Sequence, residues 1–213
     1  ILPSNNLWAF NLSAPSSSYA NYIFGSLILK PAVIPSVEGS AAANENSGRL
    51  AIIYEQNTFG ESAAVAAAQA AMSLSMEITL YQPFKTENPD PMALKTLAKD
   101  VSESGAHLVY MVCSDPEMSV QLVDALKDAY QNGLMPILIG VEGGFASQPF
   151  LNSAEADGVY LIRQAIDRSN CPGNIDTVYE AKSYAALFLL EKALQQAEEQ
   201  QPVESRLSAL INP

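Results

Sequence analysis

The 213-residue chain has a single histidine, His107, and two cysteines, Cys113 and Cys171. A His-dependent catalytic triad or a His-based metal site would have to use His107, which excludes much catalysis of these kinds. Basic residues are also scarce, because 11 Lys and Arg stand against 23 Asp and Glu and the formal net charge is −12. Nucleic acids and anionic membranes bind clustered Lys and Arg, so neither is an expected partner. No apolar run reaches the ~18 residues of a membrane-spanning helix.

The spacing of the two cysteines matches no zinc or redox motif. Two interpretations stay open, a disulfide in an oxidising compartment or two unpaired thiols in a reducing one. The chain also has no Gly-x-Ser-x-Gly elbow, no Walker loop and no Gly-x-Gly-x-x-Gly after a strand. Without a nucleophile, base or metal-ligand set, the sequence predicts a binding protein without a cofactor, and not an enzyme.

Short β-rich runs alternate with longer helical patterns along the middle of the chain, and 48% of the residues are hydrophobic, enough for a large core. We expect strands at 7–12, 49–54, 77–82, 107–112, 136–141 and 158–166, and helices at 19–29, 60–72, 92–104, 117–132 and 177–199. This alternation predicts an α/β fold with a doubly wound parallel sheet, ordered 2-1-3-4-5.

In a doubly wound sheet, ligands bind outside the carboxyl ends of the strands. The candidates at this edge are Tyr54, Phe59, Ser114, Asp115, Glu142 and Gly143. Aromatic rings, carboxylates and a glycine-rich turn on one edge suit a small ligand that has an apolar part and a positive or amino group. The sequence therefore predicts a binding site for a small molecule here.

Several of these residues also have a structural interpretation. Phe59 precedes a helix and could serve packing, and Asp115 could be a helix N-cap, because Asp-Pro-Glu is typical of a helix start. Glu142 caps no predicted helix, and burial of its carboxylate without a partner would be costly, so we favour a ligand role for it. His107 lies at the amino end of its strand, on the opposite edge, and is predicted to be structural.

Six segments then carry a resemblance to a known family: LAIIY at 50–54, FGE at 59–61, LVY at 108–110, DPEM at 115–118, IGVEG at 139–143 and ADGV at 156–159. In order and spacing they resemble the type I periplasmic solute-binding proteins of ABC transporters, specifically the branched-chain amino-acid (leucine/isoleucine/valine) receptor group. The resemblance implies two lobes that close on a ligand by hinge motion. It also implies an extracytoplasmic protein, periplasmic or lipid-anchored, whose partner is an ABC transporter permease.

The resemblance also implies roles for three of the candidates. Glu142 falls where the family's glutamate receives the ligand's α-ammonium group, and Phe59 falls where an aromatic side chain packs on the ligand. Asp115 stands where the family usually has an aromatic residue, and an extra carboxylate favours a more polar or cationic side chain on the ligand. The implied ligand is an amino acid or a related amino compound, bound in an interlobe cleft.

The same resemblance implies that the chain covers mainly the second lobe. We expect residues 1–12 to be a first-lobe strand and hinge entry, 13–167 the second lobe, and 168–213 a crossover and first-lobe helical segment. One alternative is a ligand-sensing receptor ectodomain of the same fold. Another is a receiver-like domain that binds Mg²⁺ at Glu55 and Asp115, but that chemistry needs a lysine just after the fifth strand, and Arg163 is predicted to lie inside that strand.

Overall fold

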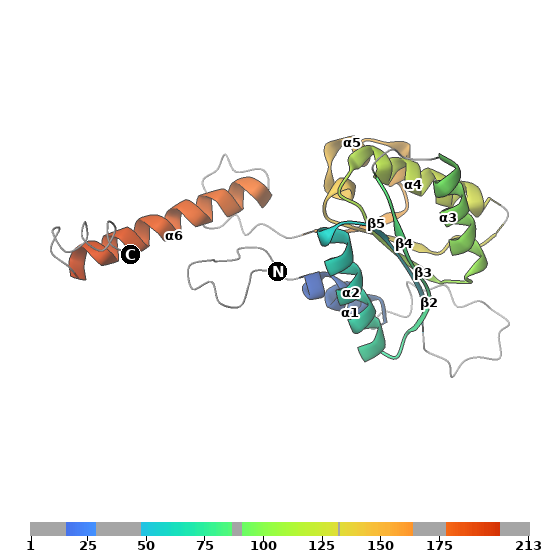
Figure 1. The fold of residues 1–213 in the computed structure, drawn as a ribbon, viewed down its shortest axis with the longest axis horizontal. Coiled ribbons are helices and arrows are strands. Elements are labelled where there is room, and N and C mark those ends of the chain that lie inside the picture. Colours follow the sequence, from blue (N-terminus) through green and yellow to red (C-terminus); the bar gives the residue numbers. More distant parts are fainter. Residues whose placement is uncertain (1–15, 29–47, 87–90, 132, 164–177, 201–213) are drawn as a thin grey trace. The chain divides into compact units, whose positions relative to one another are not determined.

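The computed structural model describes residues 16–28, 48–86, 91–131, 133–163 and 178–200 (Figure 1). The chain divides into two units, Pro15–Arg163 and a second unit of Ile1–Ala14 with Gln164–Pro213. In the second unit only helix α6 (Val178–Gln200) belongs to the described part. The predicted strand at 7–12, the crossover at 168–176 and Cys171 lie outside the described residues.

Five parallel strands form the sheet of the first unit, and the predicted fold class and strand order are confirmed. The order is β2-β1-β3-β4-β5. The strands are β1 (Arg49–Glu55), β2 (Glu77–Phe84), β3 (Leu108–Val112), β4 (Ile137–Val141) and β5 (Val159–Ile162). All five residues of the central strand β3 are buried, as expected for a parallel sheet that is covered on both faces.

Helices cover both faces of this sheet (Figure 1). They are α1 (Ser16–Ile28), α2 (Thr58–Ser73), α3 (Pro91–Glu103), α4 (Pro116–Ala129) and α5 (Gln148–Leu151), with short 3-10 turns at Gly144–Ala146 and Ala154–Ala156. Apolar side chains of α1 and α2 form one core cluster with the sheet, and those of α3, α4 and α5 form the other. The buried face of α2 consists of small residues, mostly alanine, so this helix can lie close to the sheet.

Several predicted boundaries are wrong, each for a local reason. Helix α2 begins at Thr58, two residues early, because the Asn57 side chain caps it by accepting the Gly60 N–H at 2.7 Å. Strand β2 continues through Pro83 to Phe84, two residues beyond the predicted end at residue 82. It can do so because β2 is an edge strand, in which a missing N–H is tolerated.

The fifth strand is much shorter than predicted. β5 ends at Ile162, which pairs with Val141, the last residue of β4. Beyond this point β5 has no neighbouring strand to pair with in β4. Arg163 therefore follows β5 directly and does not lie inside the strand. Only the predicted position of Arg163 is thus wrong, because the residue after the fifth strand is still not the lysine that a receiver-like domain needs. The burial of Glu55 adds a second argument below.

Candidate functional site

The residues proposed for ligand binding lie at the carboxyl ends of the strands, and we call this set the carboxyl rim (Tyr54, Phe59, Ser114, Asp115, Glu142 and Gly143). Glu55, the last residue of β1, lies beneath it and is only 6% exposed. Its Oε2 accepts hydrogen bonds from the backbone N–H and the hydroxyl of Ser114, at 2.7 and 2.5 Å, and its Oε1 accepts one from Thr86 Oγ1 at 2.8 Å. Three donors occupy most of the acceptor capacity of a carboxylate. Glu55 therefore joins the ends of β1 and β3, which leaves it unsuited to the Mg²⁺ role of a receiver-like domain.

Ser114 and Asp115 follow the end of β3 by two and three residues, after Cys113, and both are exposed. Asp115 Oδ1 accepts the backbone N–H of Met118 at 2.8 Å, which makes Asp115 the N-cap of α4. Pro116 and Glu117 then occupy the first turn, so the helix-start interpretation of this tripeptide is confirmed. This cap engages Asp115 Oδ1 and does not by itself exclude contact with a ligand. A ligand role for Asp115 therefore stays a prediction.

The Gly143-Gly144 turn lets two loops approach closely. The Gly144 N–H donates to the Cys113 carbonyl at 2.8 Å. A Cβ on Gly144 would collide with Ser119 Oγ and the Asp115 carbonyl, and Gly143 has φ +119°, which side chains rarely adopt. The close contact between the loops after β3 and β4 thus explains why glycines occupy this turn.

Phe59 lies against the same turn, in the first turn of α2. A Cβ on Gly143 would be 3.5 Å from Phe59 Cε1, and Phe59 is 37% exposed. The fold therefore brings these two predicted residues together. Tyr54 instead contacts the edge strand β2, where its ring lies 5.0 Å from that of Tyr81. Burial, and then the charge and hydrogen bond of Tyr54, raise the pKa of Tyr81 to about 12.

Glu142 directly follows β4 and is partly buried. Its backbone N–H donates to the Ile162 carbonyl at 2.8 Å, and its Oε2 accepts the hydroxyl of Tyr19 at 2.7 Å. Tyr19 belongs to α1 and lies 123 residues away in the sequence. The sequence analysis identified no structural partner for Glu142, and no local sequence signal pointed to Tyr19.

At the amino ends of the strands, His107 occupies the predicted position on the opposite edge. Its N–H donates to the Arg49 carbonyl at 2.8 Å, and its Nε2 lies 3.5 Å from Arg49 Nη2. Partial burial, and then the Arg49 charge, hold the pKa of His107 below its usual value. These contacts are structural and place His107 away from the carboxyl rim.

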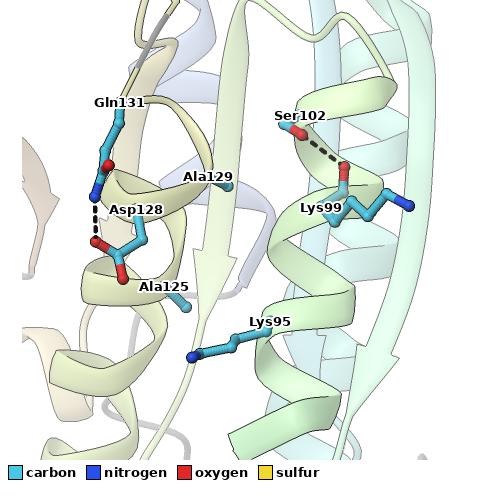
Figure 2. Close-up of a pocket in the computed structure, with 7 residues that line it drawn as sticks. All are labelled: Lys95, Lys99, Ser102, Ala125, Asp128, Ala129 and Gln131. Atoms are coloured by element: carbon cyan, nitrogen blue, oxygen red, sulfur yellow. Dashed lines mark hydrogen bonds between the residues drawn. The ribbon is translucent and has the colours of Figure 1, made fainter.

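A groove with a volume of about 360 Å³ runs between α3 and α4 (Figure 2). Its lining combines Lys95 and Lys99 of α3 with Asp128 and Gln131, and Gln131 Nε2 donates to Asp128 Oδ1 at 2.9 Å. These four side chains are exposed. No residue of the carboxyl rim lines the groove, and its mixed charges point to no particular ligand.

The described part of the chain contains no group of three or more His, Cys, Asp or Glu arranged to hold a metal ion. A search of the same residues for a helix of membrane-spanning length and hydropathy found none.

No protein-family model matches the sequence, and no curated protein matches it significantly. Solved structures do match the fold. This is the lobe fold of the type I periplasmic binding proteins. A putative branched-chain amino acid ABC transporter from Rhodospirillum rubrum aligns with a TM-score of 0.56 and 16% identity over 80% of this chain and 46% of that one.

Two further structures share the type I lobe fold. The extracellular ligand-binding receptor from Verminephrobacter eiseniae aligns with a TM-score of 0.53 and 18% identity, over 91% of this chain and 46% of that one. The fatty acid ABC transporter substrate-binding protein from Thermomonospora curvata has a TM-score of 0.51 and 15% identity, over 68% of this chain and 33% of that one. The chain thus spans less than half the length of each of these proteins, and the resemblance predicted from the sequence is confirmed at the level of the fold.

Proposed function

We propose that this chain forms most of the second lobe of an extracytoplasmic solute-binding protein that delivers an amino acid, or a related amino compound, to an ABC importer. The observation that carries the proposal is the position of Glu142. This partly buried carboxylate directly follows β4 at the carboxyl edge of the sheet, which is the edge where ligands bind in doubly wound sheets.

The chemistry of the carboxyl rim supports an amino compound as the ligand. A carboxylate and an ammonium group form a charge-assisted hydrogen bond, which is stronger than a neutral one. Phe59, beside Gly143, provides an apolar surface for the rest of the ligand. The exposed Asp115 adds a second negative charge, which favours a ligand with a polar or cationic side chain over a purely aliphatic one.

The domain division follows from the same proposal. Residues 13–167 form the second lobe, residues 1–12 the first-lobe strand and hinge entry, and residues 168–213 the crossover and a first-lobe helix. The division of the structure into Pro15–Arg163 and a remainder supports these limits within a few residues. The other half of the cleft, which would hold the ligand's carboxylate, belongs to the first lobe.

A ligand-sensing ectodomain of the same fold is the second candidate. The receptor from Verminephrobacter eiseniae, which aligns over 91% of this chain, supports it. The carboxyl rim would bind the same class of ligand in either case. Genomic context separates the two, because an importer requires permease genes nearby and a sensor requires a signalling partner.

The test is a calorimetric screen of the full-length protein against the twenty standard amino acids and small amines. We expect one of them to bind, and Glu142→Gln to weaken its binding about 10- to 100-fold, because a hydrogen bond to a charged group contributes about 1.5–3 kcal/mol. Glu117→Gln is the matched control, since Glu117 is an exposed residue in the first turn of α4. Unchanged affinity in Glu142→Gln would remove the basis of the proposal.

A further inference from the structure

Tyr19 lies outside the predicted site, but its hydroxyl donates a hydrogen bond to Glu142, a carboxylate of the carboxyl rim. We propose that Tyr19 is a positioning residue, which holds the Glu142 carboxylate in place for the ligand's ammonium group. The inference rests on the proposed function, because it presumes that Glu142 receives that group. It adds a residue that neither the sequence patterns nor the resemblance assigned.

Helix α1 can hold the Tyr19 hydroxyl in a defined position because its neighbouring side chains are anchored in the core. Ala20 and Phe24 are fully buried, and the Phe24 ring lies 5.6 Å from that of Tyr110 in β3. Tyr19 is itself half-buried and packs against the same core cluster. A tyrosine side chain has only two rotatable χ angles, so ordering it costs little conformational entropy.

Glu142 benefits from such a partner because its side chain is long and only partly buried. An unrestrained glutamate side chain loses rotamer freedom when a ligand immobilises it, and this cost reduces affinity. The 2.7 Å bond from the Tyr19 hydroxyl orders the carboxylate before the ligand arrives. The donor is also neutral, so this hydrogen bond does not itself neutralise the Glu142 carboxylate.

A purely structural role is the competing explanation. In that case the Tyr19–Glu142 bond would only fasten α1 to the end of β4, and its loss would lower stability without changing the affinity of the site. The two explanations differ in whether the effect of Tyr19 on binding passes through the Glu142 carboxylate. A double-mutant cycle measures this coupling directly.

The experiment uses the full-length protein with two probes, the standard amino acid that binds the wild type most tightly and the des-amino carboxylic acid derived from it. We expect Tyr19→Phe to weaken binding of the amino acid about three- to tenfold. In the Glu142→Gln background the same substitution should change affinity by less than about twofold, and it should leave affinity for the des-amino acid unchanged. Tyr22→Phe is the matched control, because Tyr22 lies on the same helix and is 75% exposed.

The outcomes separate this inference from the proposed function. If Glu142→Gln weakens binding but Tyr19→Phe does not, the positioning role is wrong and the proposed function stands. The same holds if the two substitutions are additive, or if Tyr19→Phe lowers only the unfolding midpoint. If no amino acid or amine binds the wild type, or if Glu142→Gln binds as the wild type does, both proposals fall.

Discussion

Two glutamates, Glu55 and Glu142, stand at the carboxyl ends of β1 and β4, and their surroundings give them different roles. Glu55 is buried and accepts three hydrogen bonds, two from Ser114 and one from Thr86. A buried carboxylate without such donors would strongly destabilise the fold. Glu142 is partly buried at the carboxyl rim and is held by Tyr19 from another layer of the molecule. Glu55 therefore stabilises the sheet, whereas Glu142 remains the candidate for the ligand.

The buried thiol of Cys113 leads to a prediction at the residue scale. Burial raises its pKa from 9.0 to about 12, so the reactive thiolate is scarce near neutral pH. In a Cys171→Ser variant we expect no reaction of the folded protein with Ellman's reagent at pH 8, and one reactive thiol per chain in denaturant. Rapid labelling of the folded variant would contradict the burial of Cys113.

The same shift determines how stability depends on pH. Between pH 9 and about 12 the unfolded chain loses the Cys113 proton and the folded chain keeps it, so stability falls as the pH rises. The slope contributed by this group is at most about 1.4 kcal/mol per pH unit. Urea unfolding at pH 8, 9 and 10 should show this contribution in the Cys171→Ser variant and not in the Cys113→Ala, Cys171→Ser double variant.

At the scale of elements, the loop between β3 and α4 combines several local tasks. Asp115 caps α4, Pro116 occupies the first turn, and the Asp115 carbonyl accepts both the N–H and the hydroxyl of Ser119, at 3.0 and 2.8 Å. The Gly143-Gly144 turn then lies against this loop. The start of α4 thus fixes the position of half of the carboxyl rim.

The capping role of Asp115 can be measured apart from any role in binding. We expect Asp115→Ala to lower the free energy of unfolding by about 1 kcal/mol, because the Met118 N–H loses its acceptor. Asp115→Asn keeps a capping oxygen, so its free energy of unfolding should lie within about 0.5 kcal/mol of the wild-type value. Urea unfolding of the three proteins tests this, and equal stability of Asp115→Ala and the wild type would show that the cap contributes nothing.

At the scale of the molecule, the parallel sheet carries helices on both faces and forms a core cluster with each helical layer. One core cluster includes Phe24, Ile52 and Tyr110, and the other includes Val109, Leu122 and Phe145. Among the residues that the structure describes, the members of both clusters lie between Tyr19 and Ile162. Helix α6, in the other unit, carries exposed apolar side chains that include Leu187 and Phe188.

Because the described core residues all belong to one unit, we predict that the proposed second lobe folds by itself. We expect a protein of residues 13–167 to unfold cooperatively, with a stability of about 5–15 kcal/mol. Its amide spectrum in heteronuclear NMR should overlay that of the 213-residue chain for the residues of the sheet. Lack of a cooperative transition, or a spectrum with poorly dispersed amide resonances, would show that the remaining segments are needed for the core.

Local patterns predicted most of the architecture because each acts over a few residues. Buried parallel strands appear as continuous apolar runs and helices as 3.6-residue periodicity, and right-handed crossovers then restrict the strand order. The errors occurred where the decisive interaction was not periodic. Asn57 extends α2 by a side-chain cap, and the end of β4 limits β5.

The site was predicted less completely for a related reason. Glu55 and Glu142 have nearly the same local pattern, since each is an acid at the end of an apolar strand. The donors that distinguish them come from elsewhere in the chain. Ser114 lies 59 residues from Glu55, and Tyr19 lies 123 residues from Glu142.

The sequence by itself determined the fold class, the strand order and the edge of the sheet where polar side chains gather, because periodicity and the handedness of crossovers suffice for these. Only the tertiary structure decided which polar groups at that edge are already engaged: Glu55 within the sheet, Asp115 at the start of α4, and Glu142 with Tyr19. Hydrogen bonds between distant segments depend on how the layers pack, and no local pattern of residues carries that information.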